Sequence, residues 1–323
     1  MPSPAFWTGC PAMRMPAADS ADPSASWPRR LQWRVESGAV HGWLGACRAL
    51  PPARASALGA RIGASLGPRI PYSRRARQNM QIALPDLDAA GRARLLRAMW
   101  ANLGRLGAEY AHLPRLSDPD AGYVEIRGLA HLRDTMAGAR PAVAAAAHLA
   151  NFEVLHVLLA RLVPRCLTIV RAPNNPRVAD PLDALRRAGG GATSPKGLQG
   201  ARDSMQVLAQ NGLVIMLADQ RMSDGVQADF FGHTAGTPAG PAQMAQRYGA
   251  PLLPTRMERV GPVAFRLTIE PPLPEPAAGD ARARRAAWTA ALNRRFEAWI
   301  RERPADWLWL HRRWPRAVYA DLA

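Results

Sequence analysis

The residues best suited to do chemistry lie in the segment 141–163, which reads PAVAAAAHLANFEVLHVLLARLV. His148 and Glu153 are five residues apart, so on one continuous helix they would point about 140° away from each other. We expect instead that a small-residue strand ends at His148 and that a helix begins near Asn151, a favourable N-cap residue. Both side chains then face one opening, where the helix N-terminus also offers backbone N–H groups to an anion.

A histidine held by a carboxylate can act as a general base toward a hydroxyl group. Glu153 would fix the tautomer of His148 and stabilise the imidazolium, as in a Ser-His-Asp triad with a substrate oxygen in place of serine. A structural interpretation, with a strand-end histidine and a surface glutamate, stays open. Glu153 and His156 also form an E-x-x-H pair, but a di-iron site needs a second pair that the sequence lacks. The zinc motif HExxH does not occur either, so we expect no metal and no cofactor.

Short β-rich segments alternate with helical segments after Pro119. This alternation predicts an α/β fold with a mixed, mainly parallel sheet flanked by helices, and ligands gather at the carboxyl ends of such strands. The expected strands are residues 123–127, 142–147, 167–171, 213–218, 251–257 and 263–269. The expected helices are residues 152–162, 178–188, 198–210, 241–248 and 282–301.

The chain before residue 116 shows helical signals and no strand candidate. One expected helix covers residues 53–66, and another begins at Asp88 and runs to Tyr110 with apolar side chains along one side. We therefore divide the chain into three parts. These are a disordered tail (1–35, rich in Pro, Ala and Ser), an N-terminal helical, membrane-docking region (36–115) and an α/β domain (116–323).

The charge of the chain points to an anionic partner. It has 42 Lys and Arg residues against 25 Asp and Glu residues, which gives a net charge of +17. Nucleic acid, an anionic membrane, a phosphorylated substrate and an acidic protein are the candidates. The 10 Trp residues favour a membrane interface. A basic nucleic-acid-binding protein is the alternative from another class, but the Arg residues are spread along the chain and no nucleic-acid-binding motif occurs.

Five sequence blocks, in the same order, carry a resemblance to a known family. They are RQNMQIALPDL (77–87), AHLANFEVL (147–155), IVRAPNNP (169–176), LADQR with DFFGHTAGTPAGPAQMAQRYGAPLLP (217–221 and 229–254) and WLWLHRRW (307–314). The chain resembles the lipid A biosynthesis acyltransferases of the lysophospholipid acyltransferase superfamily, whose histidine block typically reads H-F-x-N-W-E. Leu149 and Phe152 depart mildly from that form. The resemblance covers roughly residues 36–316 and implies the glycerolipid acyltransferase type of α/β fold.

The resemblance implies direct transfer of an acyl chain from a thioester to a lipid hydroxyl, without an acyl-enzyme. His148, oriented by Glu153, is then the general base. Arg171 follows a strand and is our choice for stabilising the oxyanion, although a surface or phosphate-binding role is the alternative. Asn151 is assigned to the same substrate-binding group.

Four further polar residues are expected to meet the acceptor. Lys196 and Arg221 would bind its phosphates, or be simply solvated. Asp219 and Gln220 follow an apolar strand and so point into the site. Asp219 would hydrogen-bond sugar hydroxyls, or cap the next loop.

Aromatic and basic residues complete the expected site. Phe230 and Phe231 would form a wall of the acyl-chain channel, with plain core packing as the alternative. The C-terminal residues His311, Arg312 and Arg313 suit phosphate contact at an interface, with an ordinary basic surface as the alternative.

The resemblance also implies the partners and the location. The acceptor is expected to be a lipid A precursor, with a lysophospholipid, an ornithine lysolipid or a glycosylated phosphoinositide as the alternative. The donor is expected to be acyl carrier protein, whose acidity suits the +17 net charge, or acyl-CoA. We expect a peripheral or shallowly inserted protein on the cytoplasmic face of the bacterial inner membrane, because no run of about 18 uncharged apolar residues occurs.

Overall fold

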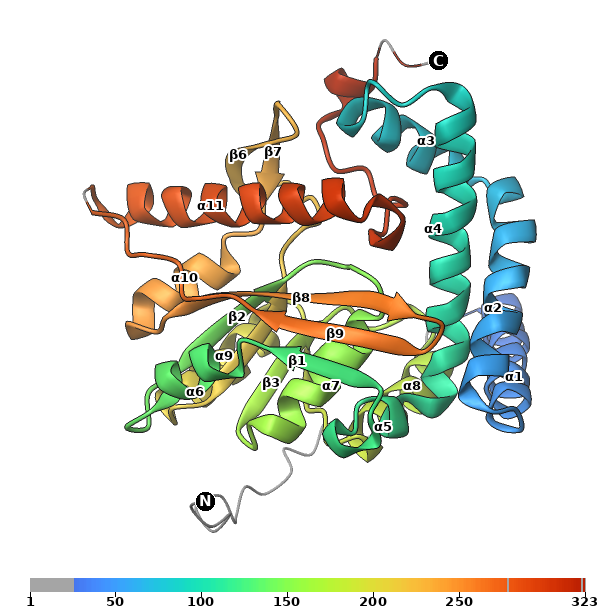
Figure 1. The fold of residues 1–323 in the computed structure, drawn as a ribbon, viewed down its shortest axis with the longest axis horizontal. Helices are drawn as coiled ribbons and strands as arrows, with labels where there is room; N and C mark the ends of the chain where they lie inside the picture. The colour runs from blue at the N-terminus through green and yellow to red at the C-terminus, as the bar shows by residue number, and fades with distance from the viewer. Residues whose placement is uncertain (1–25, 278, 321, 323) are drawn as a thin grey trace.

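The computed structural model describes residues 26–277, 279–320 and 322 of the 323-residue chain. It contains a mixed seven-stranded sheet with helices on both faces, preceded by a helical region (Figure 1). The predicted fold class, α/β with an N-terminal helical region, is confirmed.

The helical region contains long helices and one short one. They are α1 (Trp27–Arg48), α2 (Pro52–Leu66), α3 (Tyr72–Ala83), α4 (Ala89–Glu109) and α5 (Leu113–Leu116). Residues 1–25 of the expected disordered tail lie outside the described residues, but α1 begins inside that tail. The proline in its first turn is compatible with a helix start, and Trp33 is buried.

Glycines allow α2 and α4 to pack side by side at close range (Figure 1). A Cβ added at Gly59 would overlap the backbone carbonyl of Gly104, and a Cβ at Gly104 would overlap that of Gly59. The two backbones are therefore in direct contact, and α4 is held at a fixed distance from α2. This contact fixes the position of Glu109 at the end of α4.

The strands of the main sheet run in the order β1-β9-β8-β2-β5-β3-β4. Neighbouring strands pair in parallel except for β8 and β9, which are antiparallel. The carboxyl ends of β2, β5, β3 and β4 therefore meet at one edge. The strand bounds are β1 (Val124–Arg127), β2 (Ala142–Ala146), β3 (Cys166–Val170), β4 (Thr193–Pro195), β5 (Leu213–Leu217), β8 (Leu252–Gly261) and β9 (Ala264–Ile269).

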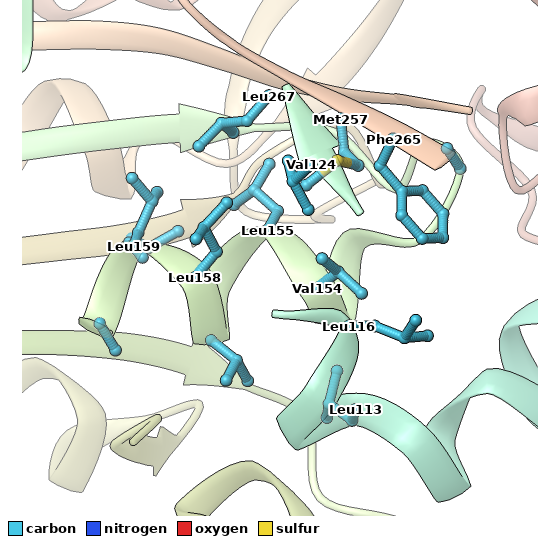
Figure 2. Packing of buried hydrophobic residues seen from close by; sticks show 14 of the residues in the cluster. Leu113, Leu116, Val124, Val154, Leu155, Leu158, Leu159, Met257, Phe265 and Leu267 are labelled. Atoms are coloured by element: carbon cyan, nitrogen blue, oxygen red, sulfur yellow. The ribbon is translucent and has the colours of Figure 1, made fainter. Parts of the chain in front are cut away.

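Helices cover both faces of the sheet, and alternate residues of β2 face the two cores. Ala144 belongs to the core that contains α7, whereas Val143 and Ala145 belong to the core that contains α10 and α11. Figure 2 shows the first core, in which apolar side chains of α7 pack against β1, β8 and β9. The covering helices are α6 (Leu129–Met136), α7 (Phe152–Leu162), α8 (Pro176–Ala188), α9 (Leu198–Ala209), α10 (Gly240–Tyr248) and α11 (Ala281–Glu302).

A separate hairpin, β6 (Val226–Phe230) with β7 (His233–Thr237), was not among the predicted strands. The hairpin packs against α11. It also packs against residues 303–320, which follow α11 and are called the C-terminal segment here: Trp314 Nε1 donates to the Phe230 carbonyl at 2.8 Å. The C-terminal segment then reaches the end of β2, because Leu149 forms an isolated bridge with Trp307. Residues distant in sequence therefore converge at the turn after β2.

Candidate active site

His148 lies at the carboxyl end of β2, in the turn that leads to α7. β2 and β5 are adjacent parallel strands, with Ala146 paired to Leu217, so the residues that follow them meet at one edge. Asp219 follows β5, and its Oδ1 lies 2.7 Å from His148 Nδ1. Its Oδ2 accepts the His148 backbone N–H at 3.1 Å. The carboxylate that holds His148 therefore comes from the neighbouring strand and not from α7.

The Asp219 carboxylate is fully buried and ionised. Trp307 Nε1 donates a hydrogen bond of 2.6 Å to its Oδ2. Burial raises the pKa of Asp219, but the charge of His148 and the hydrogen bonds from His148 and Trp307 outweigh burial and lower the pKa from 3.8 to about 2. An ionised carboxylate only accepts hydrogen bonds. When the imidazole is neutral, Nδ1 therefore carries its proton and Nε2 is left as the basic nitrogen.

His148 Nε2 is the ring nitrogen that Asp219 does not contact. The Phe152 ring packs edge-on against the imidazole, with ring centroids 5.0 Å apart. The side-chain amide nitrogen of Gln220, a predicted site residue, lies 3.3 Å from Nε2. The His148 side chain keeps an exposed fraction of 13%, so the imidazole is not sealed off from solvent.

Glu153 occupies a different place from the one predicted. Arg186 of α8 binds both oxygens of its carboxylate, with Nε to Oε2 at 2.9 Å and Nη2 to Oε1 at 2.8 Å. Arg186 also donates to the Tyr110 hydroxyl at 2.7 Å. Glu153 is buried, and no hydrogen bond or ion pair within the described ranges joins it to His148. The prediction that Glu153 orients His148 is corrected: from the first turn of α7 it holds α8, and Asp219 orients His148.

The E-x-x-H pair belongs to this same buried cluster. His156 Nε2 lies 2.9 Å from Glu153 Oε2. Burial lowers the pKa of His156 from 6.5 to about 4, although the charge of Glu153 raises it. In the part of the chain that the structure describes, no group of three or more His, Cys, Asp or Glu residues is arranged to hold a metal ion.

Arg171 follows β3 and Lys196 follows β4, at the same edge of the sheet as His148, and His311 belongs to the C-terminal segment; we call these three residues the cationic rim. Burial lowers the pKa of Lys196, and the charge of Arg171 lowers it further, whereas Asp219 raises it. Burial also lowers the pKa of His311, with smaller effects from His148, Asp219, Arg171 and Lys196. The Lys196 backbone N–H donates to the Val170 carbonyl at 3.0 Å, so Lys196 lies beside the end of β3 that leads to Arg171. The rim therefore gathers three residues that the sequence suggested for substrate binding.

Two other predicted cations are exposed beside the C-terminal segment. The guanidinium of Arg312 lies over the ring of Tyr319, 5.6 Å from its centroid. Burial raises the pKa of Tyr319, and the charges of Arg312 and Arg221 oppose this rise. The side chains of Arg312 and Arg221 are both exposed to solvent.

Arg313 is buried, with an exposed fraction of 1%, which corrects its predicted role in phosphate contact. It donates to the Gly236 carbonyl at 3.2 Å, to Thr237 Oγ1 at 2.7 Å and to Asn293 Oδ1 at 3.2 Å. Burial lowers its pKa from 12.5 to about 10, although the charge of Asp219 raises it. Arg313 therefore fastens the β6–β7 hairpin to α11 and the C-terminal segment.

Phe230 and Phe231 pack in an aromatic core, which corrects their predicted place in an acyl-chain channel. Phe230 has an exposed fraction of 0% and lies between Trp307 and Trp314, with ring centroids 5.8 and 6.0 Å away. Phe231 is also buried, under the Arg301 guanidinium at 4.4 Å. The hairpin folds back under the C-terminal segment, and this packing closes the space around both rings.

Two more predicted substrate contacts are corrected by burial. Asp219 faces His148 and Trp307 and has no exposed surface for a sugar hydroxyl. Asn151 is 1% exposed, and its amide is engaged by Glu109 and by the backbone N–H of Val154. Both side chains therefore form hydrogen bonds with other groups of the protein.

A recess next to His148 was not predicted. It lies between α4 and the C-terminal segment, and its walls are mainly apolar. Met99, Leu103 and Leu106 come from α4, Phe152 from α7 and Trp307 from the C-terminal segment. Sequence patterns do not indicate this recess, because α4 precedes His148 by a long stretch of chain.

Comparisons with known proteins show the family of the chain. The profile of the family described as "Bacterial lipid A biosynthesis acyltransferase" matches residues 28–316. The phosphatidylinositol mannoside acyltransferase of Mycolicibacterium smegmatis is 29% identical over 289 residues, which cover 87% of this chain and 91% of that protein. Its counterpart in Mycobacterium tuberculosis (strain H37Rv) is 30% identical over 284 residues, covering 84% of this chain and 86% of that protein. The resemblance read from the sequence is thereby confirmed, and the chain belongs to the bacterial lipid A biosynthesis acyltransferase family and is an acyltransferase.

Proposed function

We propose that the chain transfers a fatty acyl chain from a thioester donor to a hydroxyl of a mannosylated phosphatidylinositol. The observation that carries this choice is the similarity, over most of both chains, to proteins named phosphatidylinositol mannoside acyltransferases. This similarity favours a glycosylated phosphoinositide as the acceptor over a lipid A precursor. A lipid A precursor stays the second candidate because the family profile carries that description.

His148 is the general base of this reaction. Its Nε2 takes the proton of the acceptor hydroxyl as the oxygen attacks the thioester carbonyl. Asp219 stabilises the resulting imidazolium through the contact at 2.7 Å. The tetrahedral intermediate then expels the thiolate, which receives the proton from Nε2, so the base is restored and one ester replaces one thioester.

The oxyanion of the tetrahedral intermediate needs hydrogen-bond donors and positive charge. Arg171 follows β3 at the edge where β2 and β5 end, and it remains our proposal for this role. Gln220 is the nearest side-chain amide to Nε2, at 3.3 Å. Lys196 and His311, the other members of the cationic rim, would bind a phosphate of the donor carrier or of the acceptor.

Transfer is expected to be direct. Burial raises the pKa of both Cys47 and Cys166, so neither thiol is a ready nucleophile. A covalent acyl-enzyme is therefore not part of the proposed mechanism.

We also propose that α1 docks on an anionic membrane. Trp27, Leu31 and Val35 follow one another at helical spacing, with exposed fractions of 70%, 53% and 65%. Arg30 and Arg34 lie beside them and are exposed, which suits anionic headgroups. None of the described helices is both long and apolar enough to cross a membrane.

Membrane docking is tested by sedimentation with vesicles of phosphatidylglycerol and phosphatidylcholine. Changing Leu31 and Val35 to serine should lower the bound fraction, because both side chains lose apolar surface that would enter the bilayer. Val260→Ser, at another exposed apolar residue near the end of β8, is the matched control. Equal binding of wild type and the α1 variant would reject α1 as the docking helix.

The function is tested with radiolabelled acyl-CoA and acyl-loaded acyl carrier protein. Each donor is incubated with phosphatidylinositol mannoside, a tetra-acylated lipid A precursor and a lysophospholipid, beside the His148→Ala variant. We expect a labelled mannoside product from wild type and almost none from the variant. Product on lipid A precursor alone would favour the second candidate, and product on neither glycolipid would reject both.

A further inference from the structure

The turn that carries His148 has an unusual backbone and is held from several sides. Ala150 has a φ of +48°, a left-handed conformation that residues with a Cβ rarely adopt. The His148 carbonyl accepts the Leu308 N–H at 3.1 Å, and the Ala150 N–H donates to the Asp306 carbonyl at 2.9 Å. The C-terminal segment therefore fixes one side of the turn.

Asn151 fixes the other side. Its Oδ1 accepts the Val154 N–H at 3.2 Å and so caps α7. Its Nδ2 donates to Glu109 Oε2 at 2.8 Å. The side-chain amide has a hydrogen-bond donor, Nδ2, and an acceptor, Oδ1. The Glu109 carboxylate can bind only the donor, so Oδ1 is directed at the first turn of α7. Glu109 thereby fixes where the turn joins α7.

Glu109 is well suited to this task because it is itself immobilised. It is the last residue of α4 and has an exposed fraction of 0%. Arg259 of β8 donates to both of its oxygens at 2.7 Å. Ser56 of α2 donates to Oε1 at 2.6 Å. The carboxylate is thus fixed by a strand and by a helix before it meets Asn151.

We propose that Glu109 is a positioning residue for acyl transfer, which acts through Asn151 to hold the His148 turn in its left-handed conformation. With the turn held, the imidazole stays on Asp219 and Nε2 stays directed at the acceptor hydroxyl. The inference rests on the proposed role of His148 as general base. Loss of the Glu109–Asn151 link would release one side of the turn, while the substrate-facing residues of the cationic rim stay in place.

The decisive variant is Asn151→Ser. Serine is a good N-cap, so α7 keeps its cap, but the hydrogen bond to Glu109 is lost. Arg259 still pairs both oxygens of Glu109, so no buried charge is left alone. The matched control is Ser56→Ala, which removes a hydrogen bond to the same carboxylate without touching the turn. Asn151→Thr, whose hydroxyl also serves as an N-cap acceptor but is too short to reach Glu109, is the second variant.

Three quantities are measured: the melting temperature, kcat with KM for acyl transfer, and the proton NMR signal of the hydrogen-bonded Nδ1–H, assigned with His148→Ala. For Asn151→Ser we expect kcat to fall by about 10- to 100-fold, as for an approximately 1 Å misplacement of a catalytic group. KM should change less than kcat, and the Nδ1–H signal should broaden or vanish. Ser56→Ala should melt earlier yet keep kcat and the signal.

The outcomes separate this inference from the proposed function. If kcat per folded molecule falls by the same factor in Asn151→Ser and Ser56→Ala, and both variants keep the Nδ1–H signal, Glu109 is only a structural residue and the inference is wrong. If Asn151→Ser does not fold, the same comparison is made with Asn151→Thr. If wild type transfers no acyl chain, the proposed function fails, while the NMR signal still reports whether Asn151 holds the turn.

Discussion

Replacing Asp219 by asparagine should nearly abolish acyl transfer, whereas replacing Glu153 by glutamine should mainly lower stability. Asp219 is the carboxylate that contacts His148, at 2.7 Å. Glu153 is bound to Arg186 and lies in a different cluster. The sequence pattern alone would assign the larger catalytic effect to Glu153, so the two substitutions distinguish the two accounts.

The size of the Asp219→Asn effect follows from electrostatics. The bonded atoms are 2.7 Å apart, so the centres of charge of imidazolium and carboxylate are about 4 Å apart. At an effective dielectric constant of about 20 their attraction is about 4 kcal/mol. Losing it slows the step that forms imidazolium by about 10³-fold. If the asparagine amide also stabilises the wrong imidazole tautomer, the loss reaches about 10⁴-fold.

Glu153→Gln has a different consequence. Arg186 stays buried and loses its main charge partner, which typically costs about 3–5 kcal/mol. Asp183 also lies within 3.3 Å of Arg186, so we expect the lower end of that range and a melting temperature lower by about 5 °C. The folded protein should keep most of its kcat.

The assay compares the two variants with wild type by single-turnover acyl transfer, with rates corrected for the folded fraction measured by circular dichroism. Arg186→Gln combined with Glu153→Gln is the control, because it removes the unpaired charge and should recover part of the stability. A larger loss of rate per folded molecule in Glu153→Gln than in Asp219→Asn would refute the reasoning.

Three further predictions concern the surroundings of the site. Gly104→Ala should lower the melting temperature by several degrees in a thermal scan, because its Cβ would overlap the Gly59 backbone and force α2 away from α4. Burial lowers the pKa of His156 from 6.5 to about 4. As the pH drops from 6.5 to 4, the unfolded chain therefore takes up a proton at His156 more readily than the folded chain, and the free energy of unfolding falls by about 3 kcal/mol. His156→Gln should reduce this pH dependence of the free energy of unfolding, measured by urea titration at several pH values. Trp307→Phe removes the hydrogen bond of 2.6 Å to Asp219 and should reduce kcat by about 10-fold in the transfer assay, with Trp309→Phe as the control.

Much of the α/β part could be predicted from the sequence, because its signals are local. The segment expected to be a helix at 152–162 is α7, and the strands expected at 142–147 and 213–218 correspond to β2 and β5. Alternation of strands and helices also predicted that polar residues would gather at the carboxyl ends of the strands. The position of His148 follows directly from that rule.

The carboxylate partner of His148 could not be identified from spacing. Glu153 is near His148 in sequence, but the helix cap at Asn151 places Glu153 on the side of α7 that meets α8. Asp219 is distant in sequence and becomes a neighbour only because β5 lies beside β2. The strand order, which the sequence alone does not specify, therefore decides which acid holds the base.

Burial was the other quantity that the sequence could not supply. Arg313 lies between the exposed residue Arg312 and the buried residue Trp314, and nothing in the pattern HRRW says which arginine is turned inward. Phe230 and Phe231 read equally well as channel wall or core. Their place depends on the return of the C-terminal segment against the β6–β7 hairpin, which is a long-range contact.

The central claim is that His148 takes the acceptor proton and that the acyl chain moves directly from thioester to hydroxyl. The most direct measurement is a single-turnover reaction of wild type and His148→Ala with radiolabelled acyl thioester and phosphatidylinositol mannoside, with intact-protein mass recorded at each time point. We predict labelled product from wild type, a rate lower by at least about 10³-fold in His148→Ala, and no acyl adduct on either protein. An acyl-protein that forms and decays in step with product, or a variant with the wild-type rate, would contradict the account.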